Sequence, residues 1–465
     1  MSDQKSPDIK IHELTEGACL FSLPQGNILF GCPPEILKRI LADHLPMPDT
    51  VVVPRKLHHF HSSQASLEFP LYHFLFVQRG LERQHRFQVV ASPPQASGLE
   101  QMLRVTVVGP TEAEMAEVGT PPALAKELAR ETTFLALKNP ASGKPFAIRE
   151  MINFFPLDNG GRCEIYPVRG KAPAVALERL GDATFRLCQG EAAYDVDLTV
   201  TEEQEPNYPI RHTRFDKSAG RFKLAVLGRS NGFDPNDPAN GYILNVDGKL
   251  VLWDCPAYLH QHLKRMGLKP GDLDALILSH VHEDHIDTSE SLRDPPFELY
   301  ATPEVYWSLL VKLSAVFGCS IEEAKRFHNW HKIDVTRPTE LFGARWEFFH
   351  SVHAIPAIGC RVEKEVGGRR GVLYISGDHL SNAALEAMRQ GKGVSRQRFD
   401  ACMNRLRGDE TFVLVDAGGG AIHGDFHDFL QAPGHVGFMH TGLIGEDLPK
   451  GKELVKSGQV VDILP

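Results

Sequence analysis

Short apolar segments alternate with amphipathic segments along the second half of the chain. Leu276-Ile-Leu278 is too short for a helix and predicts a buried strand, whereas residues 258–266 have helical spacing and precede Gly267, a typical helix C-cap. Asp247-Gly248 separates two further apolar runs and predicts a β-hairpin. Strands followed by helices in this order predict a sheet covered by helices.

The first half of the chain has a less regular pattern. Residues 85–91 and 102–108 alternate apolar and polar side chains and predict antiparallel strands, and residues 121–131 predict a helix. Residues 201–209 are acidic and contain prolines, which is typical of a domain boundary. We therefore predict two domains, an α+β N-terminal domain at residues 1–215 and an α/β C-terminal domain at residues 216–465.

The two predicted domains share a local pattern. Residues 27–41 and 249–263 each combine a strand, a Cys-Pro turn and an amphipathic helix, and a further strand follows both helices. An internal repeat and a chance match explain this pattern equally well, because a strand, a turn and a helix often follow one another in proteins. If the repeat is real, Arg55 and Leu57 stand where the second copy has His280 and His282. The N-terminal domain would then be a degenerate copy without metal ligands.

Composition limits the classes of protein that remain. Hydrophobic residues make up 42% and charged residues 23%, as in ordinary globular proteins. No apolar run approaches the ~20 residues that span a bilayer, and the N-terminus has no apolar signal-peptide core, so we expect a cytoplasmic protein without a membrane partner. The net charge of -9 disfavours a large nucleic-acid surface. The eight cysteines are scattered and predict reduced thiols.

A cluster of histidines and carboxylates follows the predicted strand at residues 276–278. The segment is Ser279-His-Val-His-Glu-Asp-His-Ile-Asp287. In an extended chain His280 and His282 lie on one face and can bind one metal ion, and after a turn Asp284 and His285 can reach a second ion. A second group, His58, His59 and His61, has no later carboxylate to complete a ligand set, so we predict a surface loop there.

The His-x-His-x-Asp-His pattern resembles the metallo-β-lactamase superfamily of metallohydrolases, from about Phe222 to the C-terminus. The resemblance implies an αββα sandwich that binds two divalent ions, Zn²⁺ or alternatively Mn or Fe. It implies that His353, at the exit of a predicted strand, joins His280 and His282, with His350 as the alternative. It also implies a supporting role for Asp254 beside the ligating histidines.

The same resemblance implies the remaining ligands. Ser-Gly-Asp378 is similar to the segment that supplies a carboxylate bridging the two ions. His440 then completes the second metal site with Asp284 and His285, and His423 and His435 are the alternatives for its place. In the reaction Asp284 would orient the nucleophile and His423 would donate a proton to the leaving oxygen.

These ligands imply a hydrolase that uses a metal-bridging hydroxide. The spacing most resembles the ribonuclease Z and cyclic-nucleotide phosphodiesterase branch, and the acidic balance favours a small anionic phosphodiester, such as a cyclic nucleotide, over RNA. Alternatives are hydrolysis of a lactone, thioester or β-lactam, RNA processing, and a metal-binding scaffold without catalysis. We also expect a homo-oligomer.

Overall fold

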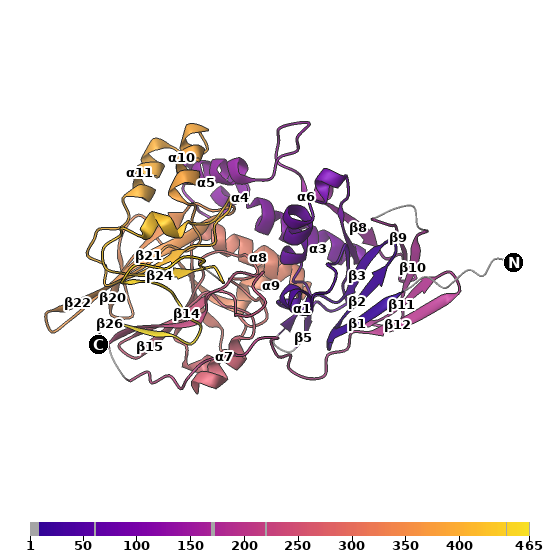
Figure 1. The fold of residues 1–465 in the computed structure, drawn as a ribbon, viewed down its shortest axis with the longest axis horizontal. Coiled ribbons are helices and arrows are strands. Elements are labelled where there is room, and N and C mark those ends of the chain that lie inside the picture. Colours follow the sequence, from indigo (N-terminus) through magenta and orange to yellow (C-terminus); the bar gives the residue numbers. More distant parts are fainter. Residues whose placement is uncertain (1–8, 60–61, 169–172, 219–220, 443, 465) are drawn as a thin grey trace.

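The protein consists of two sheet-and-helix bodies that lie side by side (Figure 1). The computed structural model describes residues 9–59, 62–168, 173–218, 221–442 and 444–464. Two of the four larger sheets are built from strands before residue 198, and the other two from strands after residue 221. The domain boundary itself stays a prediction.

The C-terminal body contains two seven-stranded sheets. The first has the order β18-β17-β16-β15-β14-β13-β26 and the second the order β19-β20-β21-β22-β23-β24-β25. The strands of the first sheet are β13 (Phe222–Gly228), β14 (Gly241–Val246), β15 (Lys249–Trp253), β16 (Ala275–Ile277), β17 (Phe297–Ala301), β18 (His328–Lys332) and β26 (Val460–Leu464). Those of the second are β19 (Thr339–Leu341), β20 (Ala344–Ser351), β21 (Ala357–Val366), β22 (Arg369–Ile375), β23 (Phe412–Asp416), β24 (His435–Met439) and β25 (Lys452–Leu454).

The two sheets pack face to face and carry helices on their outer sides. Trp253 of the first sheet and Trp346 of the second lie in one buried apolar cluster between them. Helices α7 (Leu259–Met266) and α8 (Pro303–Phe317) pack on the first sheet, and α10 (Asn382–Gln390) and α11 (Arg396–Met403) lie near the second (Figure 1). This arrangement confirms the αββα sandwich. Local predictions are confirmed as well, since Asp247-Gly248 turns with positive φ and Gly267 caps α7 in the left-handed conformation.

The N-terminal body is a smaller sandwich. Its first sheet has the order β1-β2-β3-β4-β7-β8 and its second the order β12-β11-β10-β9, and an apolar cluster that includes Phe30 and Phe185 joins them. The strands are β1 (Lys10–Thr15), β2 (Ala18–Leu23), β3 (Gly26–Phe30), β4 (Thr50–Val52), β7 (Phe87–Ala91), β8 (Ile152–Pro156), β9 (Arg162–Ile165), β10 (Val175–Arg179), β11 (Thr184–Gln189) and β12 (Ala192–Asp197). The helices of this half of the chain are α1 (Ile36–Ala42), α2 (Glu68–Tyr72), α3 (Pro93–Leu103), α4 (Glu112–Glu117), α5 (Pro122–Leu135) and α6 (Ile148–Met151), and α4 and α5 lie beside α10 of the C-terminal body (Figure 1).

The two bodies repeat one structural unit. In both, a parallel strand pair encloses a short helix, β3-α1-β4 in the first and β15-α7-β16 in the second. Gly31 and Asp254 each precede a Cys-Pro turn and have positive φ angles of 72° and 60°. Glu35 and Tyr258, which directly precede the two helices, also have positive φ angles, of 55° and 60°. The next strand and helix also correspond, β7-α3 and β17-α8, and these two helices pack on each other at Gly98 and Ala315.

Two local predictions in the first half are wrong. Residues 102–108 are helical, because α3 continues into a π-helical turn, η3 (Arg104–Val108), and Leu99, Met102 and Thr106 are buried at helical spacing. A capping box at Ser92 and Gln95 starts α3, and this signal outweighs the short alternation of valines. The sheet here is also not antiparallel, because β7 pairs in parallel with β4 and β8.

The predicted surface loop of histidines is also wrong where the structure describes it. His58 and His59 form a short strand, β5 (His58–His59), and are half-buried, and the ring of His58 packs on Phe317. His61 lies outside the described residues. Within the described ranges, no single helix is long and apolar enough to cross a membrane.

Candidate metal centre

The His-x-His-x-Asp-His segment forms a buried loop at the carboxyl end of β16. The strand ends at Ile277, before the position that the sequence predicted, and the loop turns at His282, whose carbonyl accepts bonds from the amides of His285 and Ile286. Backbone bonds from Cys255 to His285 and from Asp287 to Cys255 fix the far side of the loop. The loop therefore has backbone support on both sides.

Three imidazole nitrogens converge at one end of the site. Nδ1 of His282 lies 3.0 Å from Nε2 of His280 and 3.1 Å from Nε2 of His353. All three rings are buried. Burial lowers the pKa of His280 and His282 well below the usual value and that of His353 to about 4, so the rings are neutral at pH 7. Neutral imidazoles are the form that binds divalent metals.

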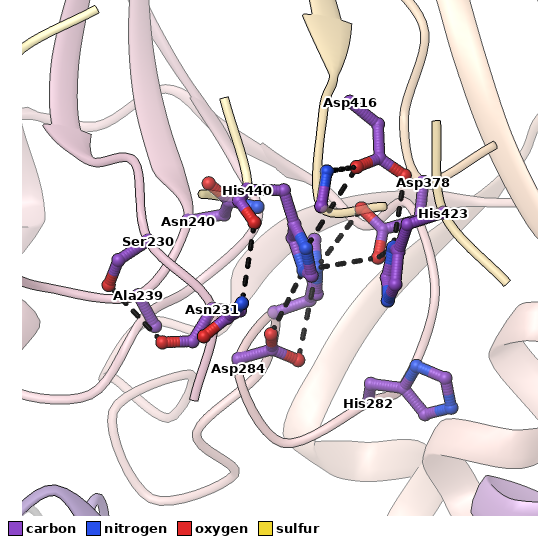
Figure 2. A network of polar contacts seen from close by, with 12 residues as sticks. Ser230, Asn231, Ala239, Asn240, His282, Asp284, Asp378, Asp416, His423 and His440 are labelled. Atoms are coloured by element: carbon purple, nitrogen blue, oxygen red, sulfur yellow. Dashed lines mark hydrogen bonds and ion pairs between the residues drawn. The ribbon is translucent and has the colours of Figure 1, made fainter. Parts of the chain in front are cut away.

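Asp284, His285 and His440 form a second group. Nε2 of His440 lies 3.1 Å from Oδ2 of Asp284 (Figure 2). Nε2 of His285 lies 3.9 Å from Oδ1 of the same carboxylate. Burial opposes a charge on these two rings, but the surrounding carboxylates outweigh it and raise the pKa of His440 to about 9 and that of His285 well above its usual value. The carboxylates thus create a site that attracts positive charge.

Asp378 lies between the two groups. Its Oδ1 is 3.3 Å from Nε2 of His285, and its Oδ2 is 3.3 Å from Nε2 of His440 and 3.8 Å from Nε2 of both His280 and His353. The residue is fully buried, and within the described part of the chain its carboxylate oxygens make no hydrogen bond of ordinary geometry and face only these imidazole nitrogens and that of His423. A buried carboxylate without hydrogen bonds is costly unless a cation accompanies it. The donor set therefore fits divalent metal ions.

Contacts behind the ligand atoms orient the rings. Asp254 holds Nδ1 of His285 at 2.7 Å and accepts bonds from the backbone and hydroxyl of Ser279. The carbonyl of Ile422 lies 2.9 Å from Nδ1 of His353. Such partners fix which ring nitrogen faces a metal. The position of Asp254 agrees with the supporting role that the resemblance implies.

His423 lies at the edge of the cluster beside His440. Its Nδ1 is 3.0 Å from Oδ2 of Asp416, and its ring stacks on His440 with 4.3 Å between the ring centroids. Figure 2 shows these side chains around Asp378. Gly418 is required here, because a Cβ at that position would lie 2.9 Å from Nδ1 of His440 and 3.0 Å from the ring of His423.

The structure separates the predicted ligands from two of the three alternatives, His350 and His435, whereas His423 stays within the cluster. It brings together all seven predicted metal ligands, but whether they bind metal stays a prediction; the ligands are His280, His282, Asp284, His285, His353, Asp378 and His440. His350 instead lies 2.5 Å from Glu304, and His435 lies 3.0 Å from Glu453 with a 43% exposed side chain.

Two groups at the site escaped the sequence analysis. Asp416 is the last residue of β23, and Asp378 follows shortly after the end of β22. Its position at the end of an apolar strand could therefore have identified Asp416 as a candidate site residue. Asp416 also accepts backbone bonds from His379 and Gly418. The second group is the carbonyl of Thr106 in η3, which lies 2.9 Å from Nε2 of His282. Every residue has a backbone carbonyl, so this contact cannot be recognised from residue type.

The two-sheet sandwich and the histidine loop of the C-terminal half are similar to those of metallo-β-lactamase-fold hydrolases. Residues 222–365 match the family described as anti-Pycsar protein Apyc1. Two curated relatives from Dictyostelium discoideum are a cGMP-dependent 3',5'-cGMP phosphodiesterase A, 28% identical over 208 residues, and a cAMP/cGMP-dependent 3',5'-cAMP/cGMP phosphodiesterase B, 22% identical over 250 residues. These matches cover 43% and 52% of this chain but only 23% and 22% of the relatives, so the chain spans less than a quarter of their length.

Solved structures with a similar fold cover the same half of the chain. One is a diphosphatase of the PhnP family, with 21% sequence identity and a TM-score of 0.39, which matches over 53% of this chain and 100% of its own.

Proposed function

We propose that this chain is a metal-dependent phosphodiesterase that acts on a small anionic phosphodiester such as a cyclic nucleotide. The observation that carries the proposal is Asp378, a fully buried carboxylate whose oxygens lie 3.3 Å from the imidazole nitrogens of His285 and His440. The names of the curated relatives support the choice of a phosphodiester over other substrates.

The residues suit two divalent ions, and we favour Zn²⁺ because imidazole and carboxylate are common ligands of this metal. His280, His282 and His353 would hold one ion and Asp284, His285 and His440 the other, with Asp378 between them. Divalent ions bound here would supply Lewis acidity and would lower the pKa of water toward neutrality. The carboxylates of Asp284 and Asp378 offset only part of the charge of two such ions, so the site favours an anionic substrate.

His423, oriented by Asp416, is placed to donate a proton to the leaving group. Asp416 orients the ring of His423 through Nδ1, which leaves Nε2 to donate a proton to a leaving oxygen. The side chain of His423 is 18% exposed, whereas those of Asp378 and His440 are 1% and 3% exposed. His423 is therefore the member of this group that a substrate can reach. Asp284, whose Oδ2 lies 3.1 Å from Nε2 of His440, would orient the attacking water.

A substrate panel tests the proposal. The purified chain, reconstituted with Zn²⁺ or Mn²⁺, is assayed with 3',5'-cyclic AMP, 3',5'-cyclic GMP and bis-p-nitrophenyl phosphate, and in parallel with a lactone, a thioester and a β-lactam. We expect turnover of the phosphodiesters. Turnover confined to the carbonyl substrates would replace the proposed reaction by carbonyl hydrolysis on the same site. No turnover of any substrate by a metal-loaded chain would favour a metal-binding scaffold.

A further inference from the structure

The metal-binding loop has close contacts with the N-terminal half of the chain. The backbone amide of Glu68, at the start of α2, donates to the carboxylate of Glu283 at 2.9 Å, and the amide of Glu283 donates to the carboxylate of Glu68 at the same distance. Glu283 lies between the predicted ligands His282 and Asp284. This reciprocal pair therefore fixes the backbone at the centre of the motif.

A buried lysine completes the contact. Nζ of Lys312, on α8, donates at 2.9 Å to the second carboxylate oxygen of Glu68 and at 2.9 Å to the carbonyl of Val281. Glu68 is fully buried and Lys312 is 4% exposed. A buried ion pair with further hydrogen bonds resists movement, because a displaced partner leaves an unpaired charge in the interior. Glu68 and Lys312 thus hold the loop at Val281 and at Glu283.

The N-terminal half also contacts one of the ligand rings directly. The carbonyl of Thr106 lies 2.9 Å from Nε2 of His282, which directs Nδ1 toward His280 and His353. The ring of Tyr72 meets His282 edge-on at 6.0 Å, and its hydroxyl donates to the same carbonyl. π-Helical turns such as η3 shift carbonyls out of the α-helical register and are frequent at functional sites.

We propose that the N-terminal half is a structural part of the metal centre and that Glu68 is a positioning residue for its metal-binding loop. Metal affinity then depends on a side chain outside the half that binds the metal. This inference rests on the metal centre of the proposed function but not on its substrate. It also gives a role to the N-terminal copy, in which Arg55 and Leu57 replace the first ligands: the copy supplies hydrogen bonds to the working site.

The test compares Glu68→Ala and Glu68→Gln with Asp49→Ala and Asp49→Asn. Asp49 is a matched control, because it is a buried carboxylate of the same half and accepts a backbone amide bond, from Asn27, at 2.9 Å. Zn²⁺ affinity is measured by competition with a chromophoric chelator, and the visible spectrum of the Co²⁺-substituted protein reports the ligand geometry. Thermal midpoints of all variants are recorded in parallel.

We expect Glu68→Ala to weaken Zn²⁺ binding about 10- to 100-fold, as for other groups that orient metal ligands, and to change the Co²⁺ spectrum. Glu68→Gln keeps one acceptor oxygen and should lose less. The Asp49 variants should lower the thermal midpoint without changing affinity or spectrum. Wild-type affinity and spectrum in Glu68→Ala, or equal losses in the Asp49 variants, would overturn the proposal.

A double variant keeps the test decisive if Glu68→Ala does not fold. Lys312→Met leaves the carboxylate of Glu68 buried without its cation, whereas Glu68→Gln with Lys312→Met removes both charges. We expect the double variant to bind Zn²⁺ more tightly than Lys312→Met alone. Strictly additive losses would contradict coupling through this pair. Because the deciding readouts are Zn²⁺ affinity and the Co²⁺ spectrum, a wild-type chain that binds metal but hydrolyses no phosphodiester would refute the proposed substrate and leave this inference standing.

Discussion

The position of His440 at the site depends on an unusual backbone conformation. His440 adopts a positive φ of 63°, an uncommon conformation for a residue with a side chain, and this turn brings Nε2 within 3.3 Å of Asp378. Local strain of this kind persists only where the surroundings hold it. Here the amide of His440 bonds to the carbonyl of Arg229 and its ring stacks on His423.

Substitution of His423 tests its proposed role as proton donor. His423→Gln should lower kcat on an unactivated cyclic nucleotide by about 10²-fold, because general acid catalysis contributes at least that much, and should leave metal content unchanged. His427 offers a matched control, since it also pairs with an aspartate, Asp425, but is 53% exposed. His427→Gln should retain full activity. A loss of bound metal in His423→Gln would instead assign His423 as a ligand.

The pair of Glu304 and His350 should make stability depend on pH. Burial opposes the ionised carboxyl, but the ring of His350 beside it lowers the pKa of Glu304 from 4.5 to about 2. A depressed carboxyl pKa stabilises the fold above the unfolded value near pH 4.5, and this contribution disappears as the pH falls through 2. Urea unfolding should show Glu304→Gln less stable than wild type by on the order of 3 kcal/mol at pH 7, with a smaller difference below pH 4. A difference independent of pH would contradict this ion pair.

At the scale of elements, the turn after β3 differs from the similar turn after β15 in the residue that it can hold. Gly31 has a φ of 72°, and a Cβ there would lie 1.8 Å from the carbonyl oxygen of Gly17. Asp254 occupies the corresponding turn after β15 and lies 2.7 Å from Nδ1 of His285. The turn after β3 thus has no space for a carboxylate at this position.

Gly31→Ala should therefore destabilise the protein by at least ~3 kcal/mol, from the left-handed backbone together with the steric overlap. Gly271→Ala is the control, because a Cβ at Gly271 would meet no atom of the described residues within 4 Å and the backbone there has no positive φ. It should change the free energy of unfolding by no more than ~0.5 kcal/mol. Equal effects in chemical denaturation would contradict the tight turn.

The sequence predicted the elements around the metal centre better than those of the N-terminal half. Apolar strands that end in histidine or aspartate can be recognised from the sequence alone. The run before His280 and the Ser-Gly-Asp378 segment are examples. The strand predicted at residues 102–108 failed because valines favour strands locally, while the capping box at Ser92 and burial at helical spacing decide the fold. The contact of Thr106 with His282 could not be predicted, because it joins a backbone carbonyl to a ring far away in the chain.

At the scale of the whole molecule, the two halves share buried polar contacts as well as apolar ones. Glu304 of the C-terminal half accepts a hydrogen bond from Thr120, and Arg398 pairs with the buried Glu131. Together with the contact of Glu68 and Glu283, these bonds favour unfolding of the two halves as one unit. The expected homo-oligomer and the choice among substrates stay predictions.

Metal removal should lower the stability of the whole chain. Ions that bind only the folded state stabilise it in proportion to the logarithm of their concentration over Kd, about 4 kcal/mol at 1,000 times Kd. Dialysis against a chelator should lower the thermal midpoint by several degrees, and Zn²⁺ should restore it. An unchanged midpoint would indicate that the histidine cluster holds no metal in the folded protein.

The proposed metal centre is tested most directly by the metal content of wild type and Asp378→Ala, measured by elemental analysis after reconstitution and gel filtration. Asp400→Ala, which removes a half-exposed carboxylate of α11 that pairs with Arg396, is the control. We predict about two divalent ions per chain in wild type and in Asp400→Ala, and a loss of bound metal with loss of phosphodiester turnover in Asp378→Ala. Wild-type protein that retains no metal, or Asp378→Ala with full metal content and full turnover, would contradict the proposed centre.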